Sequence, residues 1–123
     1  MLTFTPTATI VHLGLFREKV TLQPVEYYSR LPSDNKFDIC YILDPLIATG
    51  GTTAAAIDMI KDWGVDNVRI IAINASRSGL EFILRTHPNV NIYVGAIDEE
   101  LSDRGEILPG VGDAGDRLFN SVI

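Results

Sequence analysis

The residues best suited to chemistry gather in one short stretch, 44–53, which begins with a carboxylate and continues with small and hydroxylated residues. Asp44 ends an apolar run, while Gly50 and Gly51 leave their backbone N–H groups unhindered. Three threonine hydroxyl groups stand beside these glycines: Thr49, Thr52 and Thr53. Helix-forming residues follow, so the positive end of a helix dipole would lie at this loop. The loop suits a phosphate and the carboxylate suits sugar hydroxyls, which together predict a ribose phosphate site.

An ordinary strand-to-helix turn that happens to contain glycines is the alternative interpretation of this loop. It is not a Walker loop, because no Gly-Lys-Ser/Thr sequence follows the glycines. Its position favours a ligand, since ligands of open α/β sheets bind beyond the carboxyl ends of the strands.

A second glycine-rich stretch, residues 110–115, matches the pattern G-x-G-x-x-G. We reject dinucleotide binding, because that fingerprint requires a following helix, a second strand and a distant acidic residue, and the chain ends at Ile123. A loop with so many glycines can bring its backbone close to a flat ligand, where N–H and C=O groups recognise the edge of a nucleobase. A C-terminal tail without a ligand is the alternative.

Four other residues could do chemistry, but each has a simpler structural interpretation. Arg17 is a solvated charge on a polar segment, His12 and His87 lie in a strand and at a helix end, and Cys40 is a small core residue. The acidic run at residues 98–100 is expected to be a solvated turn. The sequence shows no nucleophile–base pair and no metal-binding cluster with recognisable spacing.

The elements that must position these residues alternate between strands and helices. We expect strands at residues 8–15, 25–28, 37–43, 67–73 and 90–97, and helices at residues 52–63 and 78–86. The nearly continuous apolar run at 37–43 is typical of a strand buried on both faces of a parallel sheet. In the second helix, Leu80, Ile83 and Leu84 are expected on one buried face. This alternation predicts an α/β fold with a parallel sheet flanked by helices.

Length and charge limit the classes of function. A chain of 123 residues makes one domain. Its net charge of −6 argues against binding to nucleic acid or to an anionic membrane, so a phosphate site must be local and built from backbone donors. With one cysteine it forms no internal disulfide. No apolar run reaches the roughly 18 residues of a membrane span, so we expect a cytoplasmic protein.

The two loops together resemble those of uracil phosphoribosyltransferases. Residues 44–52 resemble that family's phosphoribosyl-diphosphate loop, and residues 107–117 resemble its uracil-reading loop. Shorter similarities lie at residues 14–17, 21–28, 31–32 and 96–98. The resemblance runs from about Pro6 to Phe119. It implies a type I-like phosphoribosyltransferase domain over residues 1–123, apparently truncated at its N-terminus, with a β-arm at about 15–30 and ligand loops at 44–53 and 106–117.

The resemblance also implies a reaction. Uracil N1 would displace pyrophosphate from phosphoribosyl diphosphate, forming uridine monophosphate in pyrimidine salvage. The implied enzyme is a glycosyltransferase that uses Mg²⁺ bound through the phosphoribosyl diphosphate, forms a homo-oligomer and carries the family's GTP-binding property. The expected partners are uracil and phosphoribosyl diphosphate, with no nucleic acid and no membrane. The two loops are expected to face one cleft.

Site residues follow from the same resemblance. The implied catalytic residues are Arg17, Asp44 and Asp113. Those implied for phosphoribosyl diphosphate are Arg17, Asp44, Pro45, Leu46, Ile47, Ala48, Thr49, Gly50, Gly51, Thr52 and Asp113. Those implied for uracil are Ile107, Gly112, Asp113 and Ala114. No protein-ligated metal is expected.

The chain departs from the family pattern in several ways. Family members carry a long N-terminal part, with an Arg-Ala-Gly loop, that has no counterpart here. Glu106 stands where the family has an aromatic residue, and residues 120–123 differ from the usual ending. A sheet edge would be left unpaired. The alternative function is therefore a catalytically weak or inactive homologue that acts as a ligand-binding or regulatory protein.

Overall fold

The protein is described from a computed structural model that covers residues 2–17, 24–29, 31–33 and 37–120. Its elements, in chain order, are β1 (Leu13–Arg17), β2 (Pro24–Ser29), β3 (Cys40–Leu43), β4 (Leu46–Ile47), α1 (Gly51–Asp62), β5 (Val68–Ser76), α2 (Arg77–Thr86), β6 (Asn91–Asp98), β7 (Glu100–Leu101), β8 (Ile107–Leu108) and α3 (Ala114–Phe119). The strands and helices alternate as the sequence predicts, from β3 to β6.

The main sheet is parallel and has β5 at its centre. β6 pairs with one edge of β5, while β3 and β4 pair one after the other with the opposite edge. In register, Ile42 lies opposite Ile70 and Leu46 lies opposite Asn74. The carboxyl ends of β3, β5 and β6 therefore meet at one edge of the sheet, where ligands of open α/β sheets bind.

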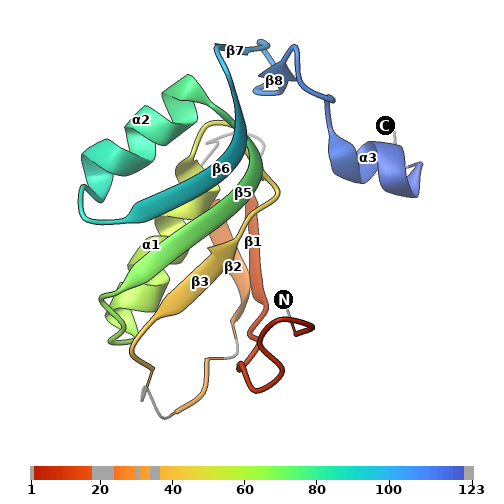
Figure 1. The fold of residues 1–123 in the computed structure, drawn as a ribbon. Coiled ribbons are helices and arrows are strands. Elements are labelled where there is room, and N and C mark those ends of the chain that lie inside the picture. The colour runs from red at the N-terminus through yellow and green to blue at the C-terminus, as the bar shows by residue number, and fades with distance from the viewer. Residues whose placement is uncertain (1, 18–23, 30, 34–36, 121–123) are drawn as a thin grey trace.

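Helices α1 and α2 cover one face of this sheet (Figure 1). Their buried isoleucines Ile57 and Ile83 are 0% exposed and pack into one core with Ile70 of β5. The chain leaves α1 through Gly64, whose φ of 105° suits a residue without a side chain. The predicted helices are thus confirmed, but Leu84 is 44% exposed, because it lies beside Ile83 on the outer flank of α2.

The other face of the sheet is apolar but open. Six large side chains on it are between 38% and 71% exposed: Tyr41, Leu43, Ile71, Ile73, Tyr93 and Ile97. The prediction that residues 37–43 are buried on both faces is therefore wrong for this chain. Half-buried and exposed residues alternate along β3, because α1 covers only one of its faces.

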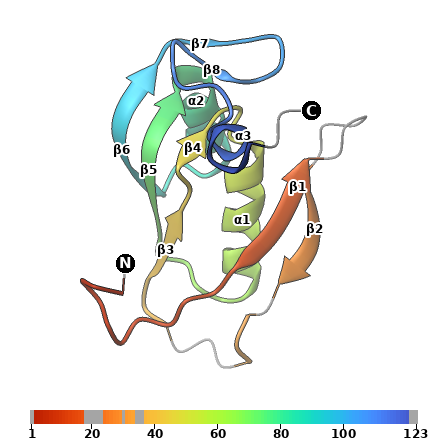
Figure 2. The same ribbon diagram turned by 90° about the vertical axis from the view of Figure 1, so that its right-hand side faces the viewer.

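A two-stranded arm lies beside α1, where β1 pairs with β2 in antiparallel fashion (Figure 2). The predicted first strand began at residue 8, but residues 8–12 have no regular structure and β1 begins at Leu13. The middle of the predicted polar arm, residues 18–23, lies outside the described residues.

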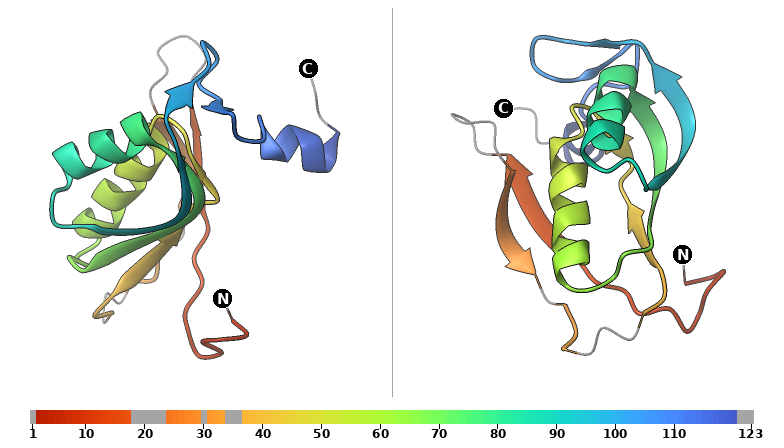
Figure 3. Two further views of the ribbon diagram at one scale, coloured as in Figure 1. Left: turned by 45° about the horizontal axis from the view of Figure 1, so that its top comes forward. Right: turned by 90° about the vertical axis from the view of Figure 1, so that its left-hand side faces the viewer.

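The C-terminal part holds structure that the sequence analysis missed. Strands β7 and β8 form a small antiparallel pair, and a cis Leu108–Pro109 bond follows. Residues 110–115 were expected to form only a loop, yet α3 begins at Ala114, where the Asp113 carboxylate accepts a hydrogen bond from Asp116 N at 3.0 Å. Helix α3 projects away from the sheet (Figure 3). No helix in the described part of the chain is long and apolar enough to cross a membrane.

Candidate functional site

Asp44 occupies the interruption between β3 and β4, at the carboxyl edge of the sheet. Its backbone N–H donates to Ile71 O at 3.1 Å, and Pro45 O accepts hydrogen bonds from Ile73 N and Asn74 N, both at 3.1 Å. These bonds keep the interruption attached to β5. The residue that the sequence singled out therefore has a fixed backbone beside the loop that follows it.

The Asp44 side chain is half-buried and held by a neighbouring hydroxyl group. Thr53 Oγ1, in the first turn of α1, donates to Asp44 Oδ2 at 2.6 Å. Thr53 is 2% exposed. Burial raises the pKa of Asp44, while hydrogen bonds from the Thr53 side chain and the Leu46 backbone act in the opposite direction. The sequence places the Thr53 hydroxyl among the loop's donors, but this contact is visible only in the structure.

The N-terminus of α1 has no side-chain cap. Gly50 is the N-cap residue, with φ 81°. The first turn contains no acidic residue that would repel a phosphate. The first N–H groups of a helix have no partner within it, and the dipole adds positive potential at the same place. The loop and helix are therefore chemically suited to a phosphate group, as expected from residues 44–53.

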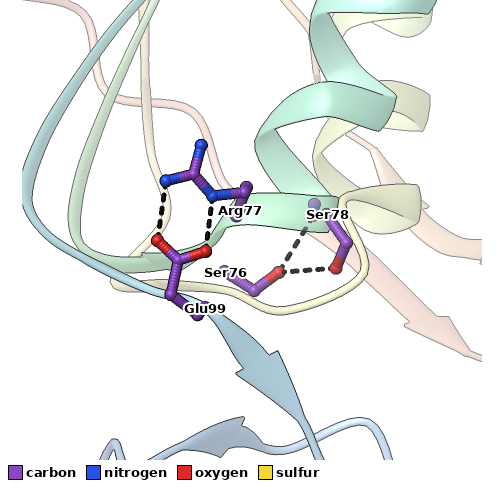
Figure 4. Close-up of polar contacts among 5 residues, drawn as sticks. Ser76, Arg77, Ser78 and Glu99 are labelled. Atoms are coloured by element: carbon purple, nitrogen blue, oxygen red, sulfur yellow. Dashed lines mark hydrogen bonds and ion pairs between the residues drawn. The ribbon is translucent and has the colours of Figure 1, made fainter.

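The loop at residues 48–50 packs against the start of α2, which fixes its backbone. Ser76 is fully buried, and its hydroxyl group donates a hydrogen bond to Ala48 O. The same oxygen accepts a hydrogen bond from Gly79 N at 2.9 Å. Figure 4 shows Ser76 at the start of α2, beside Ser78. A side chain on Gly79 would place its Cβ 2.3 Å from Ala48 O, and one on Gly50 would place its Cβ 2.5 Å from Gly79 O. The two backbones can touch only because both residues are glycine. Ser76 and Gly79 are not among the site residues expected from the sequence. A serine before a helix is a common N-cap, and this pattern at the end of β5 is the available signal for Ser76.

Polar pairs join the carboxyl ends of β5 and β6. Asn74 Nδ2 donates to Asp98 Oδ2 at 2.9 Å. Arg77 Nε and Nη2 each donate to one carboxylate oxygen of Glu99 at 2.6 Å (Figure 4). These bonds to Arg77 lower the pKa of Glu99. Both side chains are exposed, so water weakens the attraction and the pair mainly orients this edge of the sheet.

The predicted uracil loop lies near this edge of the sheet, where Leu108 and Pro109 line a cavity with residues 97–100. The volume of this cavity is about 420 Å³. Ile107 is 4% exposed in β8, Gly112 has a φ of 72°, and Asp113 caps α3.

The predicted site residues therefore fall into two groups. Asp44 and Thr52 line a different cavity from Leu108, and Gly112 and Asp113 line neither cavity. The chain after Leu108 extends away from the sheet (Figure 1). The expectation that both loops face one cleft stays a prediction. Arg17 ends β1, and the position of its side chain lies outside what the structure describes.

Comparisons with known proteins fit this geometry. The family model described as uracil phosphoribosyltransferase matches residues 1–121. The uracil phosphoribosyltransferase of Roseiflexus castenholzii is 47% identical over 116 residues, which cover 94% of this chain and 56% of the relative. That of Clostridium perfringens strain 13 is 47% identical over 121 residues, covering 98% of this chain and 58% of the relative.

Solved structures show the same correspondence. The AQ2163 protein of Aquifex aeolicus superimposes with a TM-score of 0.90 at 41% identity, covering 99% of this chain and 58% of that one. An adenine phosphoribosyl transferase from Trypanosoma brucei, 18% identical with a TM-score of 0.51, shares the fold. This chain thus spans somewhat more than half the length of the curated relatives it matches. By its matched residues, its loops and its sheet, the chain belongs to the uracil phosphoribosyltransferase family.

Proposed function

We propose that residues 44–53 bind phosphoribosyl diphosphate and that the chain takes part in forming uridine monophosphate and pyrophosphate from it and uracil. The observation that carries the proposal is the Asp44 carboxylate, held by Thr53 beside an uncapped helix N-terminus without acidic residues. Family membership and both loop patterns support the same transferase.

Each part of the loop has a task in this proposal. Backbone N–H groups of residues 48–52 hold the 5′-phosphate, and Asp44 accepts hydrogen bonds from the ribose hydroxyls. Positive charge that develops on the sugar as pyrophosphate leaves is stabilised by a fixed carboxylate nearby. Arg17 faces the pyrophosphate, while the backbone at Ile107, Gly112 and Ala114 recognises uracil and Asp113 contacts the phosphoribosyl group. These last roles rest on the family resemblance.

Mg²⁺ fits this site as an ion bound through the phosphates of the ligand. Among the described residues, no group of three His, Cys, Asp or Glu side chains is placed to hold a metal ion. Mg²⁺ commonly keeps several waters and binds through substrate phosphates, so it needs no protein cage. Bound through the diphosphate, it would neutralise charge on the leaving pyrophosphate. The chain's own contribution is to position the sugar and its 5′-phosphate.

A ligand-binding homologue with little turnover is the second candidate. It is supported by the observation that neither of the two described cavities is lined by residues of both loops, since a reaction requires the nucleobase and the sugar to meet. The two candidates share the phosphoribosyl diphosphate site and differ in whether uracil is joined to the ribose.

One experiment distinguishes them. Uridine monophosphate formation is measured with this chain, uracil, phosphoribosyl diphosphate and Mg²⁺, beside the Roseiflexus castenholzii enzyme, and binding is measured separately by calorimetry. We expect saturable binding of phosphoribosyl diphosphate and measurable formation of uridine monophosphate, at a rate far below that of the relative. Binding without measurable turnover would favour the ligand-binding homologue. Turnover equal to the relative's would exclude the weak homologue. Absence of binding would overturn the site itself.

A further inference from the structure

Asn74, near the carboxyl end of β5, forms hydrogen bonds toward both neighbouring strands. It lies opposite Leu46 of β4 on one edge of β5 and opposite Ala96 of β6 on the other. Its backbone N–H donates to Pro45 O at 3.1 Å. Its side-chain Nδ2 donates to Asp98 Oδ2 at 2.9 Å. One residue thus joins the start of the phosphate loop through its backbone and the end of β6 through its side chain.

The amide group of Asn74 has a fixed orientation. A carboxylate only accepts hydrogen bonds, so Nδ2 must face Asp98 and Oδ1 must face the other way. Oδ1 is buried and has no hydrogen-bond partner among the described residues. A buried acceptor without a partner costs free energy, and an apolar side chain of the same shape would avoid that cost. The contribution of this amide is therefore its contact with Asp98.

Asp98 also belongs to the wall of a cavity. It lines the cavity of about 420 Å³ together with Leu108 and Pro109, which lie in the predicted uracil loop. Asn74 occupies Oδ2 of the carboxylate, and no described hydrogen bond occupies Oδ1. A carboxylate oxygen accepts hydrogen bonds from N–H groups, and uracil carries such groups on its ring. Asp98 is therefore placed to receive a nucleobase at one oxygen while Asn74 holds the other.

We propose that Asn74 is a positioning residue on the base side of the site: it holds the Asp98 carboxylate at the cavity wall, where that carboxylate accepts a hydrogen bond from the nucleobase. The inference rests on the proposed function and adds to it a residue that acts on the base. Because the same residue bonds Pro45 through its backbone, it also fixes the cavity wall relative to the phosphate loop.

The two bonds of Asn74 respond differently to substitution. Asn74→Leu keeps nearly the shape of the side chain and removes Nδ2, while the backbone N–H that bonds Pro45 remains. Binding of the base should therefore weaken and binding of the sugar phosphate should persist. A general loosening of the sheet would weaken both. The two affinities together distinguish a positioning role from a merely structural one.

Two ligands separate the halves of the site. Uridine monophosphate carries uracil and the ribose phosphate in one molecule, whereas ribose 5-phosphate carries the sugar phosphate alone. Calorimetry with the whole chain measures the Kd of each. We expect the unchanged chain to bind uridine monophosphate more tightly than ribose 5-phosphate. Asn74→Leu should weaken uridine monophosphate binding about tenfold and change ribose 5-phosphate binding less than about twofold.

Asn91→Leu is the matched control. Asn91 begins β6 opposite Arg69, at the other end of the same strand pair, and it is exposed. The control makes the same chemical change far along the strand from the cavity, so both affinities should stay as in the unchanged chain.

A double substitution tests whether Asn74 acts through Asp98. Asp98→Ala should weaken uridine monophosphate binding by about tenfold or more, because the acceptor itself is removed. Adding Asn74→Leu to Asp98→Ala should cause no further loss, since two residues that act as one unit are not additive. Losses that multiply in the double variant would show that Asn74 acts independently of Asp98 and would overturn the proposal.

Three further outcomes would overturn it. One is equal uridine monophosphate affinity in Asn74→Leu and the unchanged chain, and another is an equal loss for both ligands. The third is an unchanged chain that binds both ligands equally well, since the base then adds nothing. Failure of the unchanged chain to bind ribose 5-phosphate would overturn the phosphate site and this inference together, and is recognised without any variant. If Asn74→Leu does not fold, Asn74→Ser, whose hydroxyl group is too short to reach Asp98, takes its place.

Discussion

At the scale of single residues, the contact between Thr53 and Asp44 connects the fold to the proposed chemistry. Asp44 is half-buried, and a charged group in such a place needs a hydrogen bond that favours its charged form. Thr53 supplies this bond at 2.6 Å from within the first turn of α1. The helix that offers its N-terminus to a phosphate thus also fixes the carboxylate that would face the sugar.

Replacing Thr53 tests this role. Thr53→Val keeps the shape of the side chain and removes the hydroxyl group, so we expect the pKa of Asp44 to rise and the affinity for phosphoribosyl diphosphate to fall about tenfold. Thr53→Ser keeps the hydroxyl group and should behave like the unchanged chain. The measurements are carbon-13 NMR titration of the Asp44 carboxyl group and calorimetry. Equal Asp44 titration in the Val and Ser variants would show that the contact does not tune the carboxylate.

Asp44→Asn should raise the stability of the fold while it weakens binding of phosphoribosyl diphosphate. Burial raises the pKa of Asp44 above its unfolded value, so ionisation of the native carboxyl group opposes folding once the pH exceeds the unfolded pKa of about 4. Asn has no such charge and still offers an oxygen to Thr53. We expect the variant to melt a few degrees higher near neutral pH, with an advantage that fades as the pH falls toward about 4. A lower melting temperature than the parent at neutral pH would contradict this.

Binding should change in the opposite direction in the same variant. Loss of the carboxylate removes a charged acceptor for the ribose hydroxyl groups, so affinity for phosphoribosyl diphosphate should fall by about tenfold or more. Calorimetry with Mg²⁺ present checks this. Unchanged affinity would remove Asp44 from the site.

At the scale of elements, the position of the phosphate loop depends on close backbone contact with α2. Ser76 donates a hydrogen bond to Ala48 O, and Gly79 packs closely against the same carbonyl group. Gly50 packs against the backbone of Gly79. The sequence predicted the loop itself, because a strand, a carboxylate, glycines and a helix followed one another. It could not reveal the support from α2, since that contact joins residues 28 positions or more apart and depends on tertiary packing.

Two neighbouring glycines provide a matched test of this contact. Gly50→Ala would place a Cβ 2.5 Å from Gly79 O at a φ of 81°, and we expect it to destabilise the fold by about 2 kcal/mol or more. Gly51→Ala lies inside α1 with its nearest neighbour, Thr49 Oγ1, at 3.9 Å. That change should be neutral or stabilising by up to about 1 kcal/mol. Urea unfolding of both variants checks the prediction, which equal stabilities would contradict.

The sequence predicted helices and strands correctly where the local spacing of apolar residues determines the type of element. Helices α1 and α2 and the strands β3, β5 and β6 were expected within a few residues of their observed bounds. Helix α3 was missed because six residues in a glycine-rich segment give no periodic signal, and its cap at Asp113 is visible only in the structure. The late start of β1 reflects missing partners, since residues 8–12 pair with no described strand.

At the scale of the whole molecule, one face of the parallel sheet is covered and the other is open. The parallel sheet has helices on one face, whereas parallel sheets are normally covered on both. Composition could not predict the open face, because an apolar strand has the same sequence pattern whether or not another element covers it.

The most direct test of the central claim is an NMR titration of the nitrogen-15-labelled chain with phosphoribosyl diphosphate and Mg²⁺. We expect saturable shifts of the backbone amide signals at Asp44 and residues 48–53. Saturable shifts confined to residues 107–114, or no saturable shift at all, would contradict the assignment of this loop as the sugar phosphate site.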